Sequence, residues 1–222
     1  MKPPRICATI TSDDIKAVRN VESMVTLFEV RIDLIGDDWT EIAHRLTKPW
    51  IACNRSAAEG GSWQDSEARR IEKLLQAIDL GADIIDVELK TKNLVNLVKL
   101  IKRRKRCLLS YHNLEKTPSV AAMKQIVQQQ IKAGADICKI VTTANSFEDN
   151  ISILTVISEF PEQAIVAFAM GPAGAVSRVL CPLAGGEFTY ASIARGKESA
   201  PGQMTVNELH EIYRTMRTED SP

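Results

Sequence analysis

Eight short apolar runs, each followed by a segment with helical character, alternate along the whole chain. The runs are rich in β-branched residues, as in strands that are buried on both faces of a parallel sheet. They lie at 5–10, 24–34, 50–54, 84–89, 107–111, 135–142, 164–169 and 188–193. Eight such units in 222 residues predict an α/β fold, a (β/α)8 TIM barrel. No low-complexity linker divides the chain, so we expect a single domain over residues 1–222.

Helix start and stop signals fit this alternation. Gly81 follows the apolar helical repeat between Ile71 and Ile78, and it is an expected C-terminal stop. The expected helix starts are Thr117 with Pro118, Ser146, and the capping-box pair Thr205 and Glu208. An open doubly wound sheet is the main rival fold, but residues 9–12 lack the glycine-rich turn that it needs after its first strand. The barrel is therefore favoured.

Composition excludes several classes of partner. The 28 basic residues balance 28 acidic ones, which gives no electrostatic reason to expect nucleic acid or a membrane as partner. The five cysteines form no CxxC pair, and most of them lie in apolar runs, which favours a reducing cytoplasm over disulfides or a zinc site. The first residues lack the apolar region of a signal peptide, and no run approaches the roughly 20 apolar residues of a membrane span. We expect a soluble, cytoplasmic protein without a metal.

A lysine stands inside one of the buried strands. Lys139 interrupts the run 135–142 between Cys138 and Ile140. Burial of an ammonium is unfavourable by on the order of several kcal/mol unless the group is paired or loses its proton. Burial is expected to lower its pKa, and a neutral amine in an apolar pocket is a nucleophile toward carbonyl groups. The alternative is a strand-end lysine whose stem is buried while its ammonium reaches water.

Polar residues gather at the carboxyl ends of the predicted strands, which is where the active site of a barrel lies. They are Glu29, Arg31, Arg55, Asp86, Glu88, His112, Lys139, Arg178, Ser199 and Gln203. Neighbouring strands are about 4.8 Å apart, so a carboxylate, an imidazole and an amine from the fourth, fifth and sixth strands converge.

These three groups suit carbonyl chemistry through an imine. A lysine iminium acidifies the neighbouring carbon, an imidazole can move the proton, and a carboxylate can orient the imidazole. The arginines suggest an anionic substrate. Other interpretations stay open: His112 as a satisfied core histidine, Asp86 and Glu88 as a structural ion-pair network, and Glu29, Arg31 and Asp33 as a polar plug.

The ordered motifs resemble those of one family. They are Phe28-Glu29-Val30-Arg31-Ile32-Asp33, Arg55 with Glu59-Gly60-Gly61, Asp86-Val87-Glu88-Leu89, Ser110-Tyr111-His112-Asn113, Lys139, Ser177-Arg178 and Ser199-Ala200-Pro201-Gly202-Gln203. Together they are similar to the type I 3-dehydroquinate dehydratases of the shikimate pathway and aromatic amino acid biosynthesis. The resemblance implies a (β/α)8 barrel, a homodimer, and a hydro-lyase without metal or organic cofactor.

The resemblance also implies roles. Lys139 is the expected Schiff-base lysine for the C3 ketone of 3-dehydroquinate, and His112 is the expected general base and acid. Glu88 is the expected carboxylate that orients His112, and Arg178 the clamp for the substrate carboxylate. The residues expected to hold substrate hydroxyls and close the lid are Glu29, Arg31, Arg55, Ser199 and Gln203.

Two other functions remain as alternatives. Another Schiff-base barrel, such as a class I aldolase, would take phosphorylated substrates at the loops after the seventh and eighth strands. Residues 171–174 could form half of such a phosphate site, but residues 199–203 do not resemble the other half. The second alternative is a non-catalytic small-molecule-binding barrel, which would have no need to keep Lys139, His112 and Glu88 together.

Overall fold

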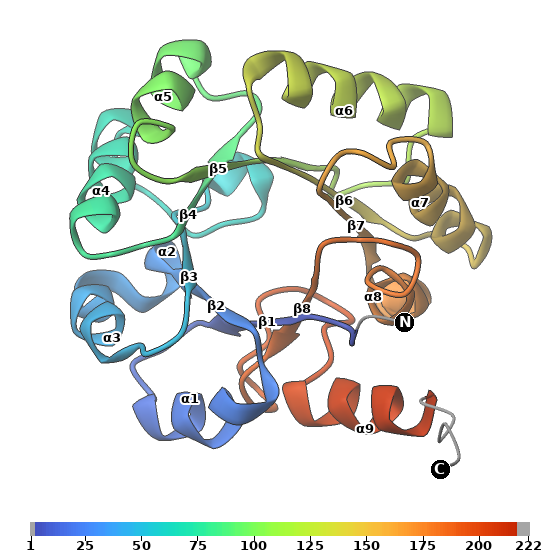
Figure 1. The fold of residues 1–222 in the computed structure, drawn as a ribbon, viewed down its shortest axis with the longest axis horizontal. Helices are drawn as coiled ribbons and strands as arrows, with labels where there is room; N and C mark the ends of the chain where they lie inside the picture. Colours follow the sequence, from blue (N-terminus) through green and yellow to red (C-terminus); the bar gives the residue numbers. More distant parts are fainter. Residues whose placement is uncertain (1–2, 217–222) are drawn as a thin grey trace.

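Eight parallel strands form one sheet that curves into a nearly closed barrel, as the alternating runs predict (Figure 1). The structure is a computed structural model that describes residues 3–216. The strands pair in the order β7-β6-β5-β4-β3-β2-β1-β8. Their bounds are β1 Ile6–Ile10, β2 Leu27–Arg31, β3 Trp50–Cys53, β4 Ile84–Glu88, β5 Arg106–His112, β6 Ile137–Thr143, β7 Ile165–Met170 and β8 Thr189–Ser192.

The helices surround this sheet on the outside of the barrel (Figure 1). The α-helices are α1 Ile15–Val21, α2 Ile32–Ile35, α3 Trp39–Arg45, α4 Glu67–Asp79, α5 Leu94–Ile101, α6 Val120–Ala133, α7 Glu148–Ser158, α8 Ala175–Leu180 and α9 Val206–Met216. Short 3-10 turns are η1 Glu22–Met24, η2 Gly36–Asp38, η3 Ala57–Glu59 and η4 Pro172–Gly174. Within residues 3–216, none of the helices has the length and apolar character that crossing a membrane requires.

The seam between β7 and β8 is closed by contacts other than a strand ladder. The backbone N–H of Glu187, just before β8, donates to the carbonyl of Ile165 at 2.7 Å. Inside the barrel the rings of Phe168 and Tyr190 meet edge to face with centroids 6.0 Å apart. These contacts bring β8 into the same wall as β6 and β7.

Alternation along the strands divides the buried residues into two sets. Outward-facing side chains such as Ala8 and Ile85 join the core beneath the helices. Inward-facing ones such as Cys7, Ile84 and Ile137 fill the barrel with apolar atoms. Further along the same strands the inward positions become polar, and the barrel thereby supports a polar site on an apolar floor.

Some predicted boundaries are wrong for local reasons. The run 24–34 yields a strand only at Leu27–Arg31, because η1 precedes it and the helical turn α2 follows it directly. Helix α6 begins at Val120 with Ser119 as its cap, whereas the Thr117 hydroxyl donates to the carbonyl of Thr143. Ser146 does not cap α7, whose N-cap position is Phe147.

Two predicted helix signals are confirmed. Glu208 accepts from the backbone N–H of Thr205 at 2.9 Å, and the Thr205 hydroxyl accepts from the N–H of Glu208 at 3.2 Å, which is the capping box. Gly81 adopts φ +97°, a left-handed conformation that favours glycine after a helix.

Candidate active site

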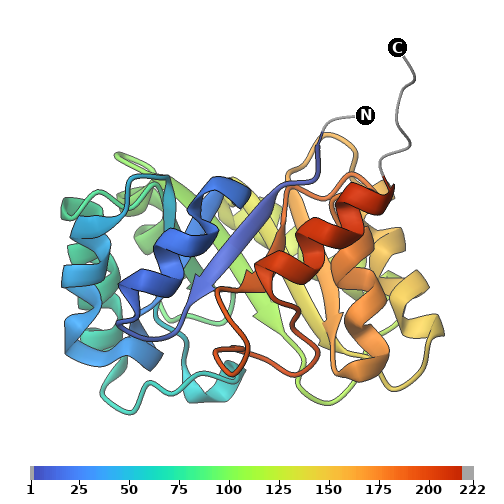
Figure 2. The ribbon, with the colours of Figure 1, turned by 90° about the horizontal axis from the view of Figure 1, so that it is seen from below.

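A pocket of about 330 Å³ opens at the carboxyl ends of the strands. In the side view of Figure 2, strand arrows such as that of β1 point toward the lower edge, where the loops that carry this pocket lie. Of the nine residues predicted for the site, all but Glu88 line it: Glu29, Arg31, Arg55, His112, Lys139, Arg178, Ser199 and Gln203. Its size and depth suit a small organic molecule.

Lys139 lies at the floor of the pocket with 5% of its surface exposed. Its Nζ donates to Asp86 Oδ2 at 3.1 Å and to Glu29 Oε1 at 3.5 Å. It also lies 4.2 Å from the centroid of the Tyr190 ring. The ammonium is therefore paired inside the barrel, and the alternative in which it reaches water does not hold.

The expected direction of the Lys139 pKa shift is wrong. Burial by itself would lower the pKa, but the carboxylates of Asp86 and Glu29 outweigh it, and the pKa of Lys139 is raised. The same contacts, with Arg55, hold the pKa of Asp86 below its usual range although burial opposes this. In the free protein Lys139 is thus an ammonium, and it must give up a proton before it can attack a carbonyl group.

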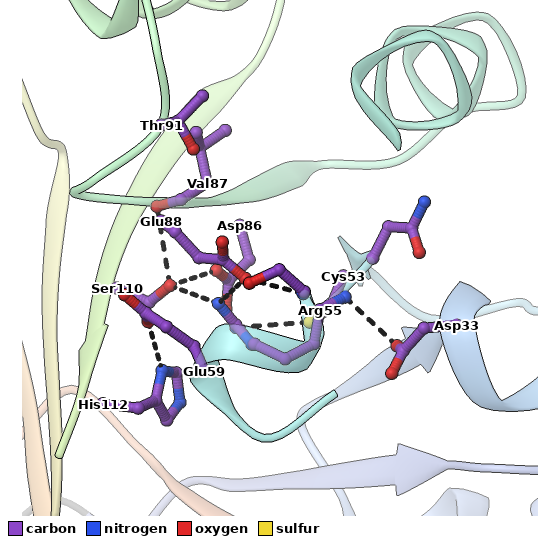
Figure 3. A network of polar contacts seen from close by, with 12 residues as sticks. Asp33, Cys53, Arg55, Glu59, Asp86, Val87, Glu88, Thr91, Ser110 and His112 are labelled. Atoms are coloured by element: carbon purple, nitrogen blue, oxygen red, sulfur yellow. Dashed lines mark hydrogen bonds and ion pairs between the residues drawn. The ribbon is translucent and has the colours of Figure 1, made fainter. Parts of the chain in front are cut away.

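His112 ends β5 and pairs with a carboxylate that was not predicted. Its Nδ1 lies 2.9 Å from Glu59 Oε2, at the end of the turn η3 (Figure 3). Burial, together with the charges of Arg55 and Lys139, holds the pKa of the imidazole well below its usual range. With Glu59 ionised, Nδ1–H donates to it and leaves Nε2 free as a base.

Glu59 is itself perturbed. Burial raises the pKa of its carboxyl to about 7, against the opposing effect of Arg55. Its second oxygen, Oε1, is buried without a hydrogen-bond partner in the described part of the chain. Because the pKa of Glu59 lies near neutral pH and its carboxylate contacts His112, the pair is suited to a site that moves protons.

The expectation that Glu88 orients His112 is wrong. Glu88 Oε1 accepts from the backbone N–H of Ser56 at 2.8 Å and from Arg55 at 3.3 Å, and Oε2 lies 3.5 Å from Arg70. In the β4–β5 register Glu88 is opposite Ser110, two residues before His112. Its carboxylate is thus held under the loop after β3, one layer below the imidazole.

Arg55 is the centre of a buried polar network (Figure 3). Its guanidinium donates to Asp86 and to the Ser110 hydroxyl, both at 2.6 Å, and to Glu88. Ser110 in turn donates to the other oxygen of Asp86 at 2.6 Å. Arg55 lines the pocket, but its main role in these contacts is to fix the Asp86 carboxylate beneath Lys139.

Arg31 is likewise engaged with protein groups. It donates to both carboxylate oxygens of Asp33, at 2.9 and 2.7 Å. Burial would lower the pKa of Arg31, but the two hydrogen bonds to Asp33 outweigh it and raise the pKa. Asp33 also accepts from the backbone N–H groups of Arg55 and Ser62, and so connects β2 to the loop that carries Glu59.

Arg178 is the contrasting case. It is buried on α8 with its guanidinium 4.4 Å from the centroid of the Phe168 ring. No group of the described residues accepts from its Nε or Nη2. Burial without a nearby carboxylate lowers the pKa of Arg178 to about 10, so it is still charged at neutral pH. A buried cation with unused donors in a pocket lining is suited to bind an anion.

Ser199 and Gln203 lie in the loop after β8 and bind each other. The Ser199 backbone N–H and hydroxyl donate to Gln203 Oε1 at 2.7 and 3.1 Å. Gln203 Nε2 donates to the Thr9 hydroxyl at 3.3 Å, which fixes the loop to β1. The two residues form one wall of the pocket, and their predicted contacts with substrate stay a prediction.

One group of described residues has the spacing of metal ligands. The ligand atoms of Glu29, Cys53 and Asp86 lie within 4.8 Å of one another. Both carboxylates already pair with Lys139, and Asp86 pairs with Arg55 as well. Burial raises the pKa of the Cys53 thiol above its usual value, so the thiol stays protonated. The three residues are therefore arranged around the Lys139 ammonium.

Comparison with known families identifies the chain. The family profile described as Type I 3-dehydroquinase matches residues 6–220. The chain belongs to this family. It is an enzyme of the lyase class, a hydro-lyase, as the motifs predict.

Relatives of the 3-dehydroquinase family match over nearly their whole length. The 3-dehydroquinate dehydratase of Dehalococcoides mccartyi is 44% identical over 216 residues, which cover 97% of each chain. That of Methanocaldococcus jannaschii is 36% identical over 219 residues, 95% of this chain and 98% of the relative. The structure of the Aquifex aeolicus 3-dehydroquinate dehydratase superposes with a TM-score of 0.80 at 26% identity, covering 96% of this chain and 99% of that one.

Proposed function

We propose that this 3-dehydroquinase converts 3-dehydroquinate into 3-dehydroshikimate and water through an imine on Lys139. The observation that carries the proposal is the placement of Lys139 Nζ, the His112 imidazole and the unpaired guanidinium of Arg178 around one pocket. Such a dehydration requires three groups, and these residues supply them: a nitrogen nucleophile, a base and a clamp for the substrate carboxylate.

The first half of the reaction builds the electron sink. The Lys139 ammonium gives up one proton, and the neutral amine attacks the C3 carbonyl. The carbonyl oxygen takes up that proton and one more from Nζ and leaves as water, so that an iminium remains at C3. Arg178 binds the substrate carboxylate by charge-assisted hydrogen bonds and fixes the ring over Lys139. Asp86 and Glu29 remain beside the nitrogen and stabilise its positive charge.

The second half moves one proton from carbon to oxygen. His112 Nε2 removes a proton from C2, and the electrons of that C–H bond neutralise the iminium to an enamine. The enamine expels the C1 hydroxyl, which takes the same proton from His112 and leaves as water. Hydrolysis of the conjugated imine returns Lys139 as an amine and releases 3-dehydroshikimate. Glu59 holds the imidazole in the required tautomer throughout.

A turnover assay tests this proposal. The product is a conjugated enone, so its ultraviolet absorbance reports the dehydration of 3-dehydroquinate directly. We expect turnover with the intact protein and none with Lys139→Met, which keeps a chain of similar length without the amine. A correctly folded wild-type protein that leaves 3-dehydroquinate unchanged would overturn the proposal and favour an aldolase substrate or a silent barrel.

We also propose a cytoplasmic homodimer. Phe147 and Ile151, one helical turn apart at the start of α7, are 59% and 60% exposed. This exposed apolar pair is the surface that we propose a second copy of the chain covers. The five cysteines are all buried and unpaired, which supports a reducing compartment.

A further inference from the structure

The ring of Tyr190 lies against the reacting nitrogen. Tyr190 is the second residue of β8 and has 3% of its surface exposed. Lys139 Nζ lies 4.2 Å from its ring centroid, well within the range of about 6 Å for a cation–π contact. Apart from the carboxylates of Asp86 and Glu29, this ring is the described group whose contact with Nζ favours a positive charge.

The ring is fixed in this position by two other aromatic residues. Phe168 meets it edge to face at a centroid distance of 6.0 Å, and Phe188 does so at 5.4 Å. Both belong to the apolar set that fills the barrel. Lys139 and Tyr190 are 5% and 3% exposed, so their contact is largely desolvated, and a cation–π contact is strongest where the cation is desolvated.

The hydroxyl of Tyr190 does not account for the residue. Buried tyrosine hydroxyls normally have a hydrogen-bond partner, but that of Tyr190 has none among the described residues. Burial raises the pKa of this hydroxyl well above its usual range, so it carries no charge. What Tyr190 offers to the site is the face of its ring.

We propose that Tyr190 is a catalytic residue whose ring stabilises the positive charge on the Lys139 nitrogen, first as ammonium and then as iminium. The iminium part rests on the proposed function, whereas the ammonium part does not. An imine withdraws electrons strongly only while it is protonated. A ring that favours the cation keeps the imine protonated at the moment when His112 removes the proton from carbon.

Other groups around Lys139 also act on its charge and must stay constant in a test. From the neighbouring strands and loops they are Cys7, Glu29, Cys53, Arg55, Asp86 and His112. A substitution at Tyr190 leaves all of them in the chain. Its effect on Lys139 can therefore be separated from theirs.

The first experiment measures Lys139 without the proposed substrate. Formaldehyde with cyanoborohydride methylates neutral amines, and peptide mapping by mass spectrometry gives the rate at Lys139 as a function of pH. Loss of the ring in Tyr190→Leu removes a favourable contact of the ammonium. We expect the pH at which methylation of Lys139 is half-maximal (the midpoint) to fall by about one unit, which is a tenfold change in the ratio of amine to ammonium.

Two variants serve as matched controls. Tyr190→Phe keeps the ring and loses only the unpartnered hydroxyl, so its midpoint should equal that of the wild type. Phe188→Leu makes the same kind of cavity in the same cluster without contact to Lys139, and it should also leave the midpoint unchanged. Tyr190→Met, whose flexible side chain fills more of the space, replaces Tyr190→Leu if that variant does not fold.

The second experiment measures turnover of 3-dehydroquinate against pH. The alkaline limb should shift to lower pH in Tyr190→Leu and stay in place in Tyr190→Phe. A midpoint that is unchanged in Tyr190→Leu, or that falls equally in Phe188→Leu, would overturn the proposal. A shifted methylation midpoint in an enzyme that does not use 3-dehydroquinate would instead refute the proposed function and leave the role of the ring at the ammonium intact.

Discussion

At the scale of single residues, the site depends on which buried charges have partners. Lys139 and Arg55 share Asp86, and Arg31 is neutralised by Asp33, whereas Arg178 has donors that no described residue uses. A buried charge that is paired with another protein group stabilises the fold, whereas an unpaired one is available to bind a ligand. This contrast separates the residues that shape the pocket from the residue that we expect to bind the substrate carboxylate.

The Glu59–His112 pair predicts an acid limb in the activity. As the pH falls through about 7, Glu59 takes up a proton, can donate it to Nδ1, and so leaves the proton of the imidazole on Nε2. His112 then cannot act as a base, and kcat/KM should fall below this pH. In Glu59→Gln we expect kcat to be roughly 100-fold lower, with no limb near pH 7.

The pH profile of the purified enzyme checks this prediction. Glu115→Gln is the control, because Glu115 is an exposed carboxylate in the loop after β5 and should leave the limb in place. An unchanged limb near pH 7 in Glu59→Gln would assign that titration to another group.

Arg178 predicts opposite effects on stability and on binding. Replacing an unpaired buried guanidinium by an apolar side chain removes an unfavourable desolvation, so Arg178→Met should raise Tm in the absence of ligand. Loss of the charge-assisted contacts should raise KM by about 10- to 100-fold. Arg195→Met, at an exposed arginine in the loop after β8, should change neither. A lower Tm together with an unchanged KM would show that Arg178 is structural.

At the scale of elements, the loop after β8 is placed by one close backbone contact. Gly202 has φ +74°, and a Cβ atom there would lie 2.3 Å from the carbonyl oxygen of Gly171. Gly171 N–H donates to the carbonyl of Pro201 at 3.0 Å, so the loops after β7 and β8 are joined. The position of Ser199 and Gln203 depends on this contact.

Two glycine substitutions separate backbone strain from loop displacement. Gly202→Ala must push the loops apart, and we expect kcat/KM to fall by about tenfold or more through misplaced groups. Gly196→Ala has a similar φ of +78° but nothing within 4 Å of the added Cβ. It should lose about 1 kcal/mol of stability from strain with kcat/KM retained. Equal losses of kcat/KM in both would contradict this role of the contact.

The helices, strands and turns also show which parts of the fold and the site could be predicted from the sequence. All strands except β2 lie within a residue or two of the predicted apolar runs. Lys139 stands out in the sequence because a cation interrupts one of these runs. Glu59 was missed because it lies 53 residues from His112 and reaches it only through the short turn η3 after β3. No periodicity marks such a turn. Its local signal is the run Glu59-Gly60-Gly61, which is part of the motif set but does not by itself pair Glu59 with His112.

At the scale of the whole molecule, the site exists only because the barrel closes. The groups around Lys139 on β6 come from β2, β4 and β8. Tyr190 reaches Lys139 because β8, the last strand, pairs with β1, the first. Side chains alternate between the inside and the outside of the barrel along each strand, which places the inward polar residues above the apolar floor. This placement can be predicted from the sequence. The identity of each ion-pair partner depends on register and side-chain reach, which a linear pattern does not contain.

The exposed apolar face of α7 predicts the assembly state. Phe147→Glu with Ile151→Glu should weaken a dimer that uses this face, because two charges would have to be desolvated at the interface. Size-exclusion chromatography with light scattering gives the mass directly. Leu100→Glu, at another exposed apolar residue on α5, is the control and should not change it. A dimer that survives the double substitution uses a different face.

The central claim is that Lys139 forms an imine with 3-dehydroquinate. Intact-protein mass spectrometry after borohydride reduction in the presence of this compound, followed by peptide mapping, tests it most directly. We predict one stable adduct, located on Lys139, and none in Lys139→Met. A folded protein that turns over 3-dehydroquinate without any adduct, or with the adduct on another lysine, would contradict the claim.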